Sequence, residues 1–236
     1  MIAIKGKRII PIVNQRGSII GENGIDIDRD LDAVLYLPGY PYSGATIYDR
    51  SGASPANDGT IDGATWVRES SGLWVLDFDG TDDVVTATRI DAVTYTGTYT
   101  FEFWFNITAA PSTHTIIQNS LGELDRNGVG LDLLGSNICL SYRDADNVLH
   151  SKSGAYTLGV WTHFLGTNNA GTLALKLNDV TQTGTEDATI RGASATLWIG
   201  NSSDGTQDFN GKLALIRIYD SVVAGHFNQE KHLFGV

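Results

Sequence analysis

Apolar and polar residues alternate along most of the chain from residue 33 onward, and the clearest case is YTFEFWFNI at residues 99–107. One face of that segment carries Tyr99, Phe101, Phe103, Phe105 and Ile107. The other face carries Thr100, Glu102, Trp104 and Asn106. A period of two with aromatic filling is typical of a β-strand that buries one face.

The same alternation returns in the second half of the chain. In TLALKLN (172–178), three leucines point inward, and Lys176 and Asn178 point outward. Further strands are predicted at 138–142, 160–167, 196–201 and 212–220, separated by turn clusters such as DRNG, DADN, SKSG, TNNAG and NSSDG. Helical spacing is confined to SVVAGHFNQEKHLFG (221–235). The pattern predicts an all-β, antiparallel fold with one short helix.

Composition agrees with this prediction. The chain has 236 residues, of which 42% are hydrophobic, 27 are glycine and 5 are proline. Such a chain can build a single large β-sandwich with many tight turns. Residues 1–32 differ, because short apolar bursts stand among charges and glycines. We therefore divide the chain into an extended N-terminal arm (1–32) and one sandwich domain (33–236).

The charge balance narrows the range of partners. The formal net charge is −11 and the isoelectric point is near 4.7, which argues against nucleic acid and against anionic membranes as partners. No segment has the length of a membrane span. Lys5, Lys7 and Arg8 interrupt the N-terminal segment, so we do not expect a signal peptide there. The single cysteine, Cys139, is expected to be a buried apolar residue.

The segment LDFDGT (76–81) raises the question of a phosphatase, because an apolar run followed by D-x-D-G-T begins the haloacid dehalogenase enzymes. Asp77 would then be the nucleophile and Asp79 the acid and base. That fold needs helices alternating with parallel strands. Here strand and turn follow Asp79 instead, so we interpret the segment as a strand that ends in an acidic loop.

Six segments, in order, carry a family resemblance. They are DRSGASPANDGTIDGATWV (49–67), LDFDGTDDVV (76–85), YTFEFWFN (99–106), GVWTHFLGT (159–167), LALKLNDV (173–180) and LWIGNSSDGTQDFNGKLALIRIYD (197–220). Together they resemble the laminin-G-like, concanavalin A-like domains of bacterial and phage proteins. The resemblance implies a jelly-roll sandwich of two antiparallel sheets.

Two positions depart from the family pattern. Where the family often has an acidic residue, in the strand that leads to R-I-Y, this chain has Ala214, and the tyrosine usual after the D-D pair is Val84. Members with calcium hold the ion near the D-G-x-D-D loop. The loss of the strand acid therefore counts against such a site here.

Calcium remains a candidate ligand at Asp79, Asp82 and Asp83. Calcium takes about 6–8 oxygen ligands, which a tight acidic loop supplies through carboxylates and carbonyls. The alternative is a solvated turn that uses Asp and Gly for backbone reasons.

Glycoside hydrolysis is a second candidate activity, because laminarinase-type enzymes share the fold class. Glu123 and Asp125 have the spacing of their first two acids, but the third acid is missing and DRNG is better interpreted as a hairpin turn. The histidines lack metal-ligand spacing, and His163 is expected to be a core residue satisfied by a hydrogen bond.

Carbohydrate binding is the third candidate, with an aromatic platform and polar loop residues as its requirements. Candidate ligand-binding residues are Trp104, Arg126, Asn127, Asn201 and Asp204. The alternative for Trp104 is packing beneath a loop.

The sequence as a whole favours a non-enzymatic binding or structural module. We expect a virion-associated protein of phage type (a decoration, fibre or tail component) that is made in the host cytoplasm, forms a homo-oligomer, is anchored through residues 1–32, and presents a lectin-like domain to a cell-surface glycan. The alternatives are a free lectin, cytoplasmic or released without a signal peptide, and a glucanase-type glycoside hydrolase.

Overall fold

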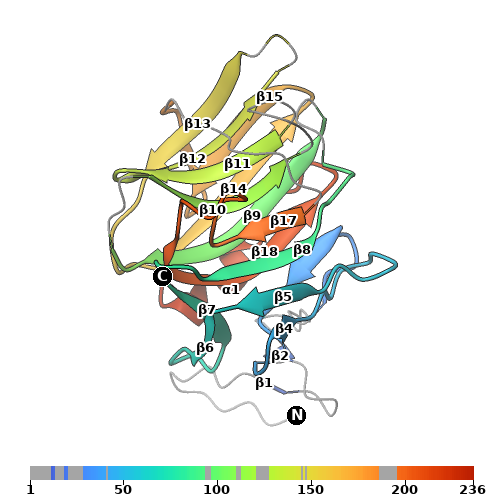
Figure 1. The fold of residues 1–236 in the computed structure, drawn as a ribbon, viewed down its shortest axis with the longest axis vertical. Helices are drawn as coiled ribbons and strands as arrows, with labels where there is room; N and C mark the ends of the chain where they lie inside the picture. Colours follow the sequence, from blue (N-terminus) through green and yellow to red (C-terminus); the bar gives the residue numbers. More distant parts are fainter. Residues whose placement is uncertain are drawn as a thin grey trace.

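The computed structural model of the chain describes residues 12–13, 19–20, 29–40, 42–93, 97–109, 113–120, 128–144, 146, 148–185 and 196–236. These residues form two antiparallel eight-stranded sheets that lie one over the other as a sandwich (Figure 1). The prediction of an all-β, antiparallel sandwich is confirmed. No helix among the described residues is long and apolar enough to cross a membrane.

The first sheet joins strands from distant parts of the chain. Its order is β13 (Leu149–Ala155), β12 (Asn137–Arg143), β11 (Gly128–Leu134), β10 (Thr113–Ser120), β17 (Thr196–Ile199), β8 (Val84–Thr88), β5 (Gly59–Asp62) and β4 (Thr46–Ile47). Strands β10 to β13 are sequential neighbours, whereas β17 enters between β10 and β8. Such crossovers between strands far apart in sequence are expected of a jelly roll.

The second sheet is built in the same way. Its order is β16 (Val180–Gln182), β15 (Thr172–Leu177), β14 (Thr162–Asn169), β9 (Tyr99–Ile107), β18 (Asn210–Tyr219), β7 (Trp74–Asp79) and β6 (Thr65–Arg68), with β3 (Leu35–Leu37) paired to β18. The long strand β18 thus pairs with β9, β7 and β3.

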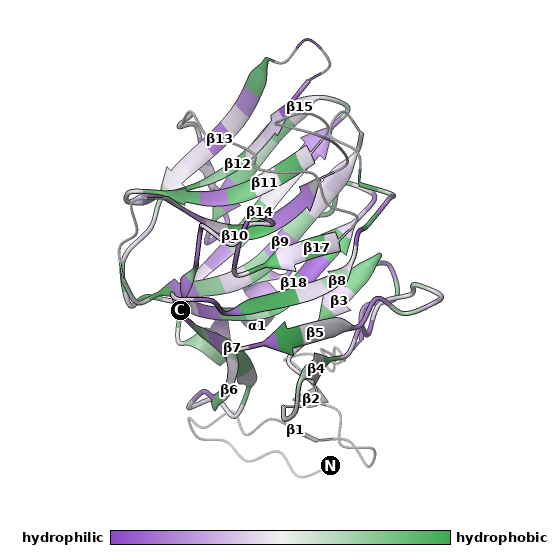
Figure 2. Cartoon of the chain, viewed as in Figure 1, coloured by the Kyte–Doolittle hydropathy of each residue, from purple (hydrophilic) through white to green (hydrophobic). Residues whose placement is uncertain are grey.

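The core lies between the two sheets, where the alternation predicted it. All five apolar side chains of β9 are fully buried in the main hydrophobic cluster, as are Leu173, Leu175 and Leu177 of β15. Hydrophobic and hydrophilic residues alternate visibly along the strands (Figure 2). The inward faces therefore supply most of the buried apolar area, which stabilises by roughly 25 cal/mol per Å².

The outer face of the second sheet is covered as well. Helix α1 (Phe227–Phe234) ends at Gly235, which adopts the left-handed conformation usual at a helix C-terminus. Leu233 and Phe234 of α1 pack on Trp104 and Trp161 in a second hydrophobic cluster. The short C-terminal helix predicted from the spacing is confirmed, and it buries a face of β9 that the alternation marks as polar.

A β-bulge interrupts the pairing of β18 with β9. Ala214 lies opposite Trp104, but the next paired residues are Arg217 and Glu102. Between these two pairs, β18 therefore contains one residue more than β9. Leu215 at this point has φ of 50°. A bulge re-aims the side chains that follow it. As a result, Arg217 lies opposite Glu102 on the outer face, beneath α1.

Little of the predicted N-terminal arm lies within the described residues. Its strands β1 (Ile12–Val13) and β2 (Ile19–Ile20) pair with each other and with no strand of the two large sheets. Asp30 forms an isolated bridge with Ser51, so the residues just before position 33 already contact the sandwich.

Candidate functional site

The acidic loop, residues 79–83, connects the end of β7 to β8. The carboxylates of Asp79, Asp82 and Asp83 bring one oxygen each within 4.8 Å of the others. The backbone N–H of Asp79 donates to Asp83 Oδ2 at 2.7 Å, and that of Thr81 donates to Asp79 Oδ1 at 2.8 Å. The chain thus places the three predicted metal ligands together, with Asp79 and Asp82 exposed and Asp83 buried.

Within the part of the chain that the structure describes, no ion pair offsets these charges. Among the described residues, the ion pairs do not include Asp79, Asp82 or Asp83. Burial raises the pKa of Asp83; the Asp79 N–H opposes the rise, while the charges of Asp79 and Asp82 add to it. Desolvation and the two neighbouring carboxylates therefore both disfavour the ionised form of Asp83.

A small hollow of about 280 Å³ opens beside the loop. Its lining includes Asp77, Asn210 and Thr108 in addition to Asp79 and Asp83. Asn210 Nδ2 donates to the carbonyl oxygen of Asp79 at 2.6 Å, and Thr108 Oγ1 donates to Asn210 Oδ1 at 2.5 Å. The lining therefore offers carboxylate, hydroxyl and amide oxygens, which suit a hard cation such as calcium.

The register of β18 corrects the inference drawn from Ala214. Asn210 is the residue opposite Asp79, whereas Ala214 lies opposite Trp104 in the second hydrophobic cluster. Four residues along a strand separate them by about 13 Å at a 3.3 Å rise per residue. An acid at position 214 would not reach the acidic loop, so its absence does not weaken a cation site there.

The residues of the acidic loop fit a weak, partly hydrated calcium site. Three carboxylates supply charge, and the hollow leaves room for water ligands that complete a coordination of about 6–8 oxygens. Gly63 is required for the fit, because a Cβ there would lie 2.0 Å from Asp83 Oδ1.

Trp104 does not form the predicted sugar platform. Its side chain is 0% exposed, and its ring stacks on Phe234 with centroids 4.2 Å apart. Its indole N–H donates to Glu230 Oε2 at 2.8 Å. The prediction is wrong because α1 packs onto the outer face of β9 and its apolar side chains contact the indole.

Two other predicted ligand residues, Asn201 and Asp204, form hydrogen bonds within their own loop. Asn201 is buried and donates to Asp208 Oδ1 at 2.6 Å. Asp204 is exposed and accepts from the hydroxyl of Thr206 at 2.7 Å. These bonds hold the connection between β17 and β18 in shape. Arg126 and Asn127, and the candidate acids Glu123 and Asp125, lie outside the described residues.

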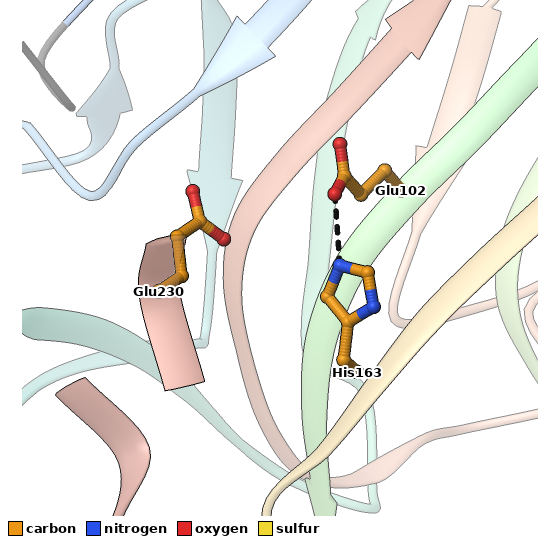
Figure 3. A group of neighbouring side chains, drawn as sticks. All are labelled: Glu102, His163 and Glu230. Carbon is orange, nitrogen blue, oxygen red and sulfur yellow. Dashed lines mark hydrogen bonds and ion pairs between the residues drawn. The ribbon is translucent and has the colours of Figure 1, made fainter. Parts of the chain in front are cut away.

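A second group of carboxylates lies beneath α1, where Glu102 from β9 and His163 from β14 face each other and Glu230 comes from the helix (Figure 3). We call it the buried ion cluster; its members are Asp30, Glu102, His163, Arg217, His226 and Glu230. His163 Nε2 and Glu102 Oε1 are 2.8 Å apart, as are His226 Nδ1 and Glu102 Oε2. As expected, His163 is a buried core histidine with a hydrogen bond at Nε2, whereas its Nδ1 has no hydrogen-bond partner among the described residues.

Arg217 supplies the positive charge at the centre of this cluster. Its Nη2 donates to Glu230 Oε1 at 2.5 Å and to the hydroxyl of Tyr36 at 3.0 Å. Its Nε lies 3.4 Å from Asp30 Oδ2, and its guanidinium carbon lies 4.3 Å from the Tyr36 ring centroid. The guanidinium thus supplies positive charge to both Glu102 and Glu230, which removes the need for a metal ion to balance them.

The protonation states follow from these contacts. Burial alone raises the pKa of Glu102, but hydrogen bonds with His163 and His226 and the charge of Arg217 hold it well below its usual range. Both Glu102 and Glu230 are at most 1% exposed. A substrate therefore cannot reach either carboxylate, and the cluster fastens the helix to the sheet.

Sequence reasoning missed the buried ion cluster. The signal was a charged residue inside an otherwise apolar strand, in TFEFWF for Glu102 and in LIRIY for Arg217. Charged residues are almost never fully buried unless paired. A central acidic residue in one apolar strand and a central basic residue in another therefore predict an ion pair between the two strands.

Comparison with known proteins gives a family and a fold. A laminin-G family model described as the concanavalin A-like lectin/glucanases superfamily matches residues 79–225. No curated protein sequence matches the chain.

Among solved structures, the botulinum neurotoxin serotype D binding domain is 14% identical, with a TM-score of 0.62, and the match covers 86% of this chain and 51% of that one. The serotype D ligand binding domain in complex with N-acetylneuraminic acid gives 16%, 0.62, 85% and 50%. The serotype G binding domain gives 15%, 0.58, 85% and 50%. The chain spans about half the length of these structures, and the likeness shows the fold.

Proposed function

The chain belongs to the concanavalin A-like lectin/glucanase superfamily, and we propose that it is a non-enzymatic module that binds a glycan. The superfamily description joins two activities, binding and hydrolysis. Most enzymes that hydrolyse a glycosidic bond use two carboxyl groups, one on either side of the bond that is cleaved. The observation that carries the proposal is the state of the buried pair: Glu102 and Glu230 are sealed between α1 and the sheet, and both face Arg217.

The structural neighbours support binding as the function. Each of those cited is described as a binding domain, and one is in complex with N-acetylneuraminic acid. The exposed carboxylates of the acidic loop all stand on one connection between β7 and β8, so they do not flank a substrate from two sides. In our proposal they hold calcium, which stabilises this end of the sandwich.

We further propose that the domain is carried on a larger assembly, a virion of phage type, through its N-terminal arm. The support is the pairing of β1 with β2 alone, because an isolated two-stranded hairpin is marginally stable in water unless something packs on it. Asp30 already contacts the sandwich at Arg50 and Ser51, so a deletion that tests this role ends before it, at residue 28.

A glycan-array screen of the full chain, in calcium and in chelator, tests the proposed function. Specific binding supports a lectin. Binding that disappears in chelator assigns the calcium a part in it, and binding that survives removes that part. The absence of any bound glycan overturns the glycan-binding proposal.

A deletion of residues 1–28 tests the anchoring role separately. Light scattering would compare the oligomeric state of the full chain with that of residues 29–236. We expect the shorter chain to lose the assembly. An unchanged oligomer overturns the anchoring role and leaves glycan binding untouched.

A further inference from the structure

Three tyrosines form an exposed cluster beside the start of β7. Tyr40, Tyr42 and Tyr48 are 40%, 47% and 40% exposed, and among the described residues they are the aromatic members of the exposed large hydrophobic side chains. The ring centroid of Tyr40 lies 5.4 Å from that of Tyr42 and 5.9 Å from that of Tyr48. Tyr42 lies nearly parallel to Trp74 at 5.9 Å. We call these four residues the tyrosine cluster.

Packing of the core does not explain the tyrosine cluster. None of its four members belongs to either hydrophobic cluster of the sandwich or packs against one among the described residues. An aromatic residue that stays 40–47% exposed forgoes nearly half of the stabilisation that full burial would give it. A group of such rings in mutual contact on a surface is typical of a binding site.

The backbone of this loop is fixed against β7. Gly39 has φ of 91°, and a Cβ at this position would lie 2.2 Å from the carbonyl oxygen of Trp74. Only glycine permits so close an approach with this φ. The approach brings the tyrosines that follow Gly39 alongside Trp74.

Hydrogen bonds hold the rest of the loop. The backbone N–H of Tyr48 donates to the carbonyl of Tyr40 at 2.9 Å. The indole N–H of Trp66 donates to the carbonyl of Gly44 at 3.0 Å. Tyr42 has φ of 61°, which is uncommon for a residue with a side chain. The backbone bonds fix Tyr40 beside Tyr48 and Gly44 beside Trp66 before any ligand binds, which lowers the entropy cost of binding.

The arrangement of the rings suits a sugar. The planes of Tyr40 and Tyr42 meet at 88°, so their rings form a corner with two aromatic walls. The guanidinium carbon of Arg50 lies 5.3 Å from the Tyr40 centroid. Aromatic faces accept the C–H face of a pyranose, and phenol and guanidinium groups bond its hydroxyl or carboxylate oxygens.

We propose that the tyrosine cluster, with Arg50 beside it, binds a pyranose unit of a glycan. This assignment rests on the proposed function and gives it a location. Size favours a sugar over a protein: three rings of about 40–47% exposure offer on the order of 250 Å². A stable protein interface buries about 800 Å² per partner.

The site is separate from the acidic loop. Trp74 and Asp79 are the first and last residues of β7. At a rise of about 3.3 Å per residue they are roughly 16 Å apart. Glycan binding at the tyrosine cluster is therefore expected to persist in chelator.

The test is a dilution series of the full chain and its variants on a glycan array that carries neutral and acidic oligosaccharides. Tyr42→Ala removes the most exposed ring, and we expect its half-saturation concentration to rise roughly tenfold, as a contact of about 1.4 kcal/mol requires. Tyr42→Phe keeps the ring and is expected to lose less. Val180→Ala, an exposed residue on the opposite edge strand of the same sheet, is the matched control.

Two results overturn the assignment, and they differ. If the triple variant Tyr40→Ala, Tyr42→Ala, Tyr48→Ala remains folded by circular dichroism and binds the same oligosaccharides as the unmodified chain, glycan binding stands and this site falls. If the unmodified chain binds no oligosaccharide, the proposed function fails and the site falls with it. Loss of binding in the tyrosine variants alone supports the assignment.

Discussion

The buried ion cluster and the acidic loop each contain three carboxylates, but the two groups differ in the positive charge that lies beside them. Beneath α1, Arg217 and His226 bring positive charge to Glu102 and Glu230. The acidic loop receives no such partner among the described residues. As a result the pKa of the fully buried Glu102 is lowered, whereas the pKa of Asp83 is raised by burial. A neighbouring positive charge, more than the depth of burial, decides whether a carboxylate is stable in its ionised form.

Removal of Arg217 from the buried ion cluster is expected to have the largest effect on stability. Arg217→Met leaves Glu102, Glu230 and Asp30 buried without their partner. We expect unfolding free energy to fall by about 3–5 kcal/mol, the usual cost of an uncompensated buried charge. Urea denaturation measures it.

Two further variants separate charge from packing at Arg217. Arg68→Met removes an exposed arginine from the same sheet, and surface changes of this kind are usually within about 0.5 kcal/mol. Combining Arg217→Met with Glu102→Gln and Glu230→Gln removes the unpaired charges and is expected to restore part of the loss. Equal effects of Arg217→Met and Arg68→Met would show that the cluster does not stabilise the fold.

Addition of calcium to the solution tests whether the acidic loop gains stability from a bound cation. If calcium occupies the acidic loop, a concentration ten times its dissociation constant stabilises the chain by about 1.4 kcal/mol. For a chain of this length that raises the melting temperature by roughly 3–5 °C. Differential scanning fluorimetry in calcium and in chelator measures the shift.

Asp83→Asn is expected to abolish the calcium shift, because it removes the buried carboxylate of the loop. Asp220→Asn, at an exposed position outside the loop, is the matched control and should keep the shift. A melting temperature that is indifferent to millimolar calcium in the unmodified chain would leave the loop a solvated acidic turn.

The smallest expected effect comes from His226 at the rim of the cluster. Its hydrogen bond with Glu102 raises the pKa of His226, although burial opposes the rise. The folded chain then holds this proton more tightly than the unfolded chain. Its contribution to stability is full below about pH 6.5 and is lost as pH rises through the raised pKa. For a partly exposed pair we expect about 1 kcal/mol or less.

The difference in pH dependence between the unmodified chain and His226→Gln isolates this contribution. That difference is needed because burial lowers the pKa of His114, although the charge of Asp208 opposes the shift, and a lowered pKa gives the opposite slope. His232→Gln, on the same helix, is the matched control. Parallel stability curves for His226→Gln and the unmodified chain would remove His226 from the cluster's electrostatics.

The fold was accessible from the sequence because its main signal is local. Alternation within β9 and β15 assigned the inward residues correctly, and the six ordered motifs indicated the family. The grouping of Asp79, Asp82 and Asp83 was also predictable, because the three residues lie within one turn of chain. Short-range patterns suffice wherever the geometry depends on neighbouring residues alone.

The buried ion cluster was not accessible, because its members come from distant segments. Glu102, His163, Arg217 and Glu230 stand on β9, β14, β18 and α1, and a bulge that alternation does not predict turns Arg217 toward Glu102. The same long-range packing hid the fate of Trp104. The tyrosine cluster was missed because Tyr40 and Trp74 become neighbours only when Gly39 meets β7.

The position of α1 over the outer face of the second sheet has a consequence for partly open states of the molecule. Detachment of this short helix is a local opening that leaves the strand ladders of both sheets in place. It would uncover the indole of Trp104 and the guanidinium of Arg217, which Phe234 and Glu230 of the helix contact in the native fold. The helix therefore protects this face of the sheet from association with other molecules.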